Sequence, residues 1–109
     1  MEYPKKIEKE LNQIGSNIKR KLDDQYAQWQ NGIEYRYLLT SYATRAKKLG
    51  LDLSELAYAL QDLGYVKIFS TPQGKRYCYS ADVPMTQEEI VTQLMEIDYA
   101  AKKGRPASV

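Results

Sequence analysis

Three positive side chains lie within residues 63–80, LGYVKIFSTPQGKRYCYS, and no acidic residue accompanies them. They are Lys67, Lys75 and Arg76, and the stretch has the composition of two strands joined by a tight turn. A lysine or arginine that reaches a phosphate displaces a condensed counterion, so a basic hairpin indicates binding to a nucleic-acid backbone. The alternative is edge protection, because charged side chains also keep exposed strands from pairing with other chains.

The side chains of the commonest catalytic and metal sites are missing. The chain has no histidine and a single cysteine, Cys78, which excludes the usual Cys/His zinc site and a nucleophile activated by histidine. The six glycines are scattered and form no phosphate-binding loop. Adjacent acids such as Asp23 and Asp24 are typical of a solvated helix face. We therefore predict no enzymatic activity, no metal and no cofactor.

The net charge is only +2, but the charges are distributed in blocks. Residues 35–51 carry four basic side chains and no acid, whereas residues 82–98 carry five carboxylates and no base. A folded chain can gather the basic blocks on one surface. The N-terminus lacks the apolar region of a signal peptide, and no apolar run reaches the ~20 residues that cross a membrane. We expect a cytoplasmic protein, which would be nucleoid-associated if it binds DNA.

The apolar periodicity places a long helix at each end of a compact centre. An apolar residue recurs every three or four positions over residues 5–30, which predicts a helix that Gly15 and Ser16 bend or break and that Asn31-Gly32 ends. A capping box, TQEE, predicts a second helix over residues 86–101.

Between these helices the pattern is shorter. Residues 33–39 fit a short strand or the start of the next helix, which Thr40 or Ser41 would cap. That helix is expected to end at Gly50. The segment LDLSELAYALQDLG then predicts a helix with a capping box between Asp52 and Glu55.

The spacing of Ala46, Gly50 and Leu56 resembles a helix-turn-helix unit, in which a small residue, a turn glycine and an apolar plug recur. The following LQDLGYV (residues 60–66) and GKRYCY (residues 74–79) resemble the passage from helix to wing in small MarR- and PadR-like regulators. The resemblance covers about residues 33–80. It implies an α+β, mainly α fold: a single winged helix-turn-helix domain at 1–101, followed by a basic flexible tail at 102–109.

In the winged-helix family the second helix of the pair enters the major groove and the wing reaches the neighbouring backbone. The resemblance therefore assigns DNA contacts to three groups. They are Arg45, Lys47 and Lys48 on the first helix, Ser54, Tyr58 and Gln61 on the second, and Lys67, Lys75 and Arg76 on the wing. Glu55 and Asp62 oppose this assignment, since carboxylates near phosphates weaken binding. The alternative is that the second helix packs or meets a protein.

The two ends of the chain add further hypotheses. Residues 103–106, KGRP, resemble the core of an AT-hook, so Lys103 and Arg105 would enter an A·T-rich minor groove, although the usual basic residues after the proline are absent. The flanking helices predict a homodimer. The dimerisation residues would be Ile7, Leu11, Ile14, Ile18, Trp29, Leu94 and Ile97, unless both helices pack on their own core.

Together these patterns predict a dimeric winged-helix protein that binds double-stranded DNA. It would be a transcriptional regulator or a plasmid, phage or chromosome-organising factor. A protein-interaction module of a larger complex is the main alternative. A third possibility is a binder of single strands or RNA that stacks bases on Tyr65, Tyr77 and Tyr79.

Overall fold

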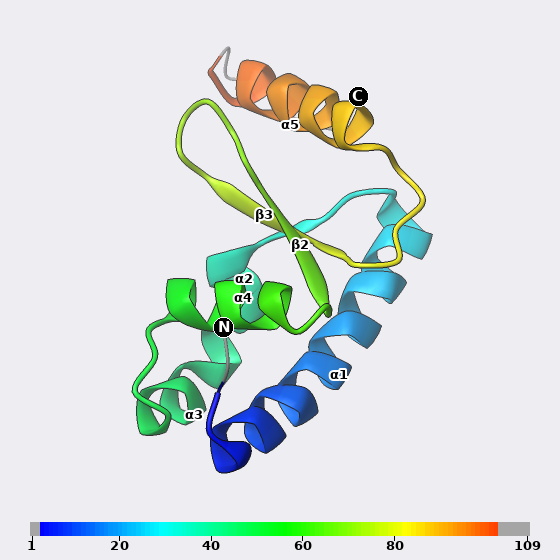
Figure 1. Cartoon of the computed structure of the whole chain (residues 1–109). Helices are drawn as coiled ribbons and strands as arrows, with labels where there is room; N and C mark the ends of the chain where they lie inside the picture. The colour runs from blue at the N-terminus through cyan, green and yellow to red at the C-terminus, as the bar shows by residue number, and fades with distance from the viewer. Residues whose placement is uncertain (1–2, 103–109) are drawn as a thin grey trace.

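The computed structural model describes residues 3–102 and is an α+β fold, mainly helical, with one three-stranded antiparallel sheet (Figure 1). The elements are α1 (Lys5–Trp29), β1 (Ile33–Glu34), α2 (Tyr35–Leu39), the 3₁₀ turn η1 (Thr40–Tyr42), α3 (Ala43–Lys48), α4 (Leu53–Asp62), β2 (Val66–Ser70), β3 (Arg76–Ser80) and α5 (Gln87–Lys102).

Helix α1 is continuous, so the prediction that Gly15 bends or breaks it was wrong. Gly15 instead lets a side chain from another element pack closely on the helix. A Cβ built on it would lie 2.3 Å from the Tyr65 ring, which rests on the bare backbone of the helix. The Tyr65 hydroxyl donates a hydrogen bond to Asn12 Oδ1 at 2.8 Å. The helix ends at Gln30 in the left-handed conformation, one residue before the predicted Asn31-Gly32.

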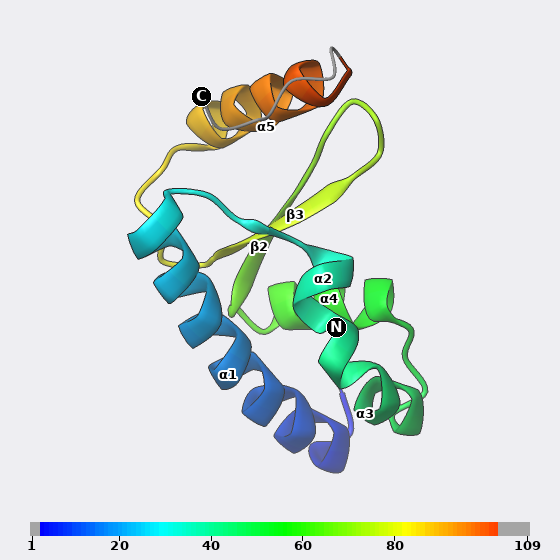
Figure 2. The ribbon, with the colours of Figure 1, turned by 180° about the vertical axis from the view of Figure 1, so that it is seen from behind.

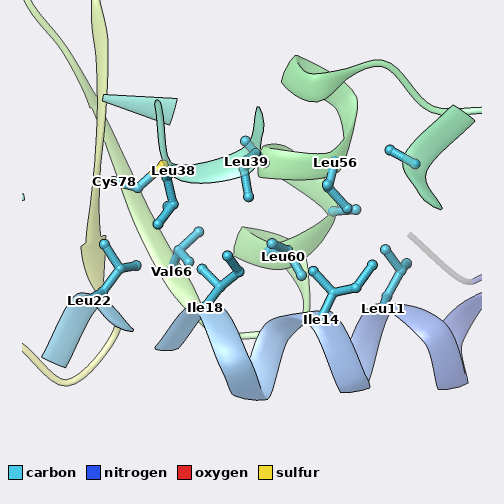
Figure 3. Close-up of a cluster of buried hydrophobic side chains, with 13 residues drawn as sticks. Leu11, Ile14, Ile18, Leu22, Leu38, Leu39, Leu56, Leu60, Val66 and Cys78 are labelled. Atoms are coloured by element: carbon cyan, nitrogen blue, oxygen red, sulfur yellow. The ribbon is translucent and has the colours of Figure 1, made fainter. Parts of the chain in front are cut away.

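The apolar stripe of α1 is covered by the chain's own core (Figure 3). Leu11, Ile14 and Ile18 are fully buried against α2, α4 and the sheet, and Leu94 of α5 is buried in a second cluster. These four side chains cannot meet a second copy in this fold, which corrects their assignment to a dimer interface. Burial removes apolar side chains from water equally well whether the covering surface belongs to the same chain or to a second copy, and here the same chain covers them.

Three other dimerisation residues have different positions. Ile7 is half-buried against the same core, whereas Trp29 is 60% exposed at the end of α1. The side chain of Ile97 lies outside the described part of the chain.

Residues 33–39 form both of the structures expected as alternatives, because a short strand is followed directly by a helix. β1 pairs with β3 in the order β1-β3-β2, with Ile33 opposite Cys78. Thr40 does not cap the next helix as predicted, because its hydroxyl donates back to the carbonyl oxygen of Arg36.

A tight turn joins α3 to α4. Ala46 and Leu56 are fully buried, and Gly50 adopts a φ of +78°. The Leu51 amide donates to the Ala46 carbonyl oxygen at 2.9 Å and closes the end of α3. The capping box predicted between Asp52 and Glu55 is present at the start of α4.

The hairpin has two different faces. Val66, Ile68 and Cys78 face the main core, while Phe69 and Tyr79 face α5. α5 therefore lies over the hairpin on the side away from α4, as both views show (Figure 2).

The turn of the hairpin forms over residues 71–74 as predicted. The Gly74 amide donates to the Thr71 carbonyl oxygen at 2.9 Å, and Gly74 has a φ of +83°. The second predicted capping box is also present, because Thr86 and Glu89 exchange hydrogen bonds at the start of α5.

Candidate nucleic-acid interface

Arg76, the first residue of β3, links the hairpin to two helices. Its Nη1 donates to Ser54 Oγ of α4 at 2.5 Å. Its guanidinium carbon lies 5.7 Å from the centroid of the Tyr35 ring on α2 and 5.6 Å from that of Tyr58 on α4. A guanidinium at these distances from aromatic rings gains cation–π attraction, which fixes its orientation. We call these four residues the arginine–tyrosine cluster.

A second arginine adjoins the cluster. Arg36 lies 6.0 Å from the Tyr35 centroid, and its Nη2 is 2.7 Å from Glu34 Oε1. The hydrogen bond that Arg36 donates to the Glu34 carboxylate raises the pKa of the Arg36 guanidinium, which therefore keeps its charge. Because Glu34 is buried and Arg36 is exposed, the pair presents its positive end to solvent.

Tyr35 and Arg36 were not among the predicted contacts. The signal for them was the segment EYRY, in which a cation alternates with aromatic rings directly after a strand. Tyr37 of the same segment is also strongly exposed.

The three basic residues predicted on α3 divide into two kinds. Arg45 Nη2 lies 2.7 Å from Glu10 Oε2 of α1, and its guanidinium lies 5.8 Å from the Tyr42 ring. It is thus engaged within the fold. Lys47 and Lys48 are exposed, and among the described residues neither forms an ion pair.

The three residues predicted to read bases from α4 also divide. Gln61 Oε1 accepts a hydrogen bond from the Ile68 amide of β2 at 2.9 Å, and Ser54 holds Arg76. Both are tied into the fold through these acceptor oxygens, so neither is wholly free for the base contact assigned to it. Tyr58 is 40% exposed and remains on the outer face of the helix.

The predicted hairpin cations lie on two faces, because side chains alternate along a strand. Lys67 stands opposite Tyr79 on the face toward α5 and adds to the lowering of the pKa of Asp82, which is due mainly to Lys19. Lys75 follows the turn, and within the described part of the chain it has no carboxylate partner.

The elements that carry most of these cations lie on one side of the molecule. Helix α1 runs along one side in both views, and α3, the start of α4 and the hairpin turn lie along the other (Figure 1, Figure 2). We call Arg36, Lys47, Lys48, Lys75 and Arg76 the basic surface. Lys103 and Arg105 of the predicted AT-hook lie outside the described residues.

The hairpin tyrosines do not form a stacking surface. Tyr79 is fully buried, and Tyr65 and Tyr77 are half-buried in the two clusters. Burial raises the pKa of the Tyr79 phenol to about 12. The third possibility, that these three rings stack on bases from one exposed surface, is therefore contradicted for Tyr79.

Other classes of site find little support in the part of the chain that the structure describes. Residues 3–102 contain no group of three potential metal ligands placed to hold an ion. No described helix has an apolar stretch of the length needed to cross a membrane. Comparison with protein-family models, curated proteins and solved structures gave no match.

Proposed function

We propose that the chain is a winged helix-turn-helix protein that binds double-stranded DNA through the basic surface, as a transcriptional regulator or a plasmid, phage or chromosome-organising factor. The strand order β1-β3-β2 and the tight turn between α3 and α4 support the fold assignment. The hairpin of β2 and β3 would then be the wing.

One observation carries the proposal: Arg76 is held by two tyrosine rings and a serine while its neighbour Lys75 is free of any ion pair within the described residues. A guanidinium oriented in advance loses less side-chain freedom when it meets a phosphate. Helix α3, which carries the exposed Lys47 and Lys48, lies on the same side of the molecule as the hairpin turn (Figure 1), and these lysines would extend the contact along a backbone.

Dimerisation stays a prediction, and of the residues first assigned to it Trp29 is still available. Among the described side chains of α1 and α5, the exposed large apolar ones are Trp29, Val91 and Met95. Sedimentation velocity of the full chain measures the oligomeric state directly.

The test is fluorescence anisotropy of labelled duplexes at low and near-physiological salt, comparing two variants with the same loss of charge. Lys48→Ala/Lys75→Ala removes two cations of the basic surface, and Arg20→Ala/Lys21→Ala removes two from the solvent face of α1. The first pair should weaken binding to every duplex and reduce the slope of log Kd against log salt by about two. The second should leave that slope nearly unchanged. Equal losses from both pairs, or no duplex binding at low salt, would contradict the proposal.

The alternative is a protein-interaction module, and the acids of the chain favour it. Glu55 and Asp62 are exposed on the outer face of α4, and Glu88, Glu89 and Glu96 are exposed on α5. Binding that is absent for all DNA probes and present for a basic protein surface would support this function.

A further inference from the structure

The two polar side chains of α4 that suit bases use their acceptor oxygens inside the chain. Ser54 Oγ accepts from Arg76 Nη1, and Gln61 Oε1 accepts from the Ile68 amide, so Gln61 does not present the free carbonyl oxygen that a bidentate pair with adenine requires. Gln61 joins α4 to β2 through that bond, and releasing it would leave a half-buried backbone amide without its partner.

Apart from the Tyr58 hydroxyl, the remaining polar side chains on this face are acidic, and each has a local partner. Glu55 Oε1 accepts from the Asp52 amide at 3.2 Å, and Asp62 Oδ2 accepts from the Tyr3 hydroxyl at 3.1 Å. Purines in the major groove are read by donors of Arg, Lys, Asn and Gln, which a carboxylate cannot replace. A carboxylate can accept only from cytosine N4, and it repels the phosphates on either side.

Cations, in contrast, lie on the elements before and after α4 in the chain. Lys47 and Lys48 precede it on α3, and Lys75 and Arg76 follow it on the hairpin, where Arg76 contacts Ser54 and Tyr58 of α4. Such cations contact phosphates, which hold the protein on the duplex but carry no sequence information.

We infer that the basic surface binds duplex DNA of any sequence, because its cations address the backbone and α4 presents no side chain that is free to make a bidentate contact with a base. This inference rests on the proposed function and narrows it. Among the proposed roles, an organising or coating protein fits this surface, and a repressor of a single operator does not.

The experiment uses the full chain and a set of duplexes of one base composition and permuted sequence, so that a general A·T preference of the C-terminal tail does not enter. Operator-specific proteins separate such duplexes by roughly a thousandfold or more. We expect dissociation constants within about tenfold of one another and no motif enriched from a random duplex library. A duplex bound roughly a hundredfold more tightly than the rest would overturn the inference while leaving the proposed function intact.

Asp62→Asn supplies a second readout, because it removes one carboxylate from the outer face of α4 and keeps the shape. It should tighten binding to every duplex by the same factor, whereas Asp24→Asn on the solvent face of α1 should change binding less. A tightening confined to a few sequences would show that α4 reads bases. Absence of binding to all duplexes at low salt would overturn the proposed function, and the inference with it.

Discussion

Replacing Gly15 with alanine should destabilise the protein, although the same change in most helices does the opposite. Gly15 lies in the middle of α1, where alanine is normally more stable than glycine by about 1 kcal/mol. In this fold the new Cβ would lie 2.3 Å from Tyr65 Cδ2 and 2.6 Å from Cε2 and Cγ, closer than any such atoms approach.

The Tyr65 ring has little freedom to move away. Its hydroxyl is bonded to Asn12 Oδ1, its amide donates to the Leu60 carbonyl oxygen at 2.9 Å, and its carbonyl oxygen accepts from the Ala81 amide at 3.3 Å. Overpacking of this kind costs about 1–3 kcal/mol, and losing the hydroxyl bond costs about 1 kcal/mol more. After the gain in helix propensity is subtracted, Gly15→Ala should lower the free energy of unfolding by about 1–3 kcal/mol.

Urea denaturation of a double-mutant cycle tests this reasoning. In the Tyr65→Ala background the ring is gone, so Gly15→Ala should raise the free energy of unfolding by about 1 kcal/mol. The effect of one substitution thus changes sign between the two backgrounds. The difference between Asn17→Ala and Asn17→Gly, at an exposed position of the same helix, calibrates the propensity contribution. A Gly15→Ala variant that is more stable in both backgrounds would refute the packing of Tyr65 on this glycine.

Two further predictions concern stability. Burial raises the pKa of the Cys78 thiol and of the Tyr79 phenol to about 12, from ordinary values of 9.0 and 10.0. Below about pH 9 both side chains are neutral in the folded and unfolded states, and their full contribution to stability is present. Above the unfolded pKa of each group, the free energy of unfolding falls by about 1.4 kcal/mol per pH unit until about pH 12. Urea denaturation at pH 8 and pH 10.5 measures the loss; Cys78→Ala should reduce it, and stability that does not change over this range would contradict the burial. Gly74→Ala should cost about 1–2 kcal/mol in the same assay, because its φ of +83° strains any residue with a Cβ while no other described atom lies within 4 Å of the added carbon. An alanine variant as stable as the parent would contradict that turn geometry.

The parts of the fold that could be predicted from the sequence depend on neighbours in the chain. The two capping boxes and the hairpin turn formed as predicted, because their partners lie three or four residues apart. The role of Gly15 was missed for the opposite reason. From the sequence alone, a glycine within a helix predicts a bend or a break. Its packing role is visible only in the fold, where Tyr65, 50 positions further along the chain, lies against it.

The apolar stripe of α1 shows that a sequence pattern can identify a buried face without identifying what buries it. Its periodicity correctly identified the face that is buried, including Leu11, Ile14 and Ile18. Periodicity does not say what covers a face, and here the sheet and α4 of the same chain cover it. A dimer interface could not be separated from an internal core by this signal, since both bury the same residue types.

The candidate site was harder to predict, because the sequence does not show which polar side chains already have a hydrogen-bond partner within the fold. Ser54 and Gln61 have the right chemistry and the right helical positions to read bases, yet each is used to hold the hairpin against α4. The same bonds that remove them from recognition orient Arg76 and fix β2, so the hairpin gains a rigid cation while α4 loses its readers. A chain whose polar side chains serve to position a cation can bind a backbone firmly and still be indifferent to the bases between the phosphates.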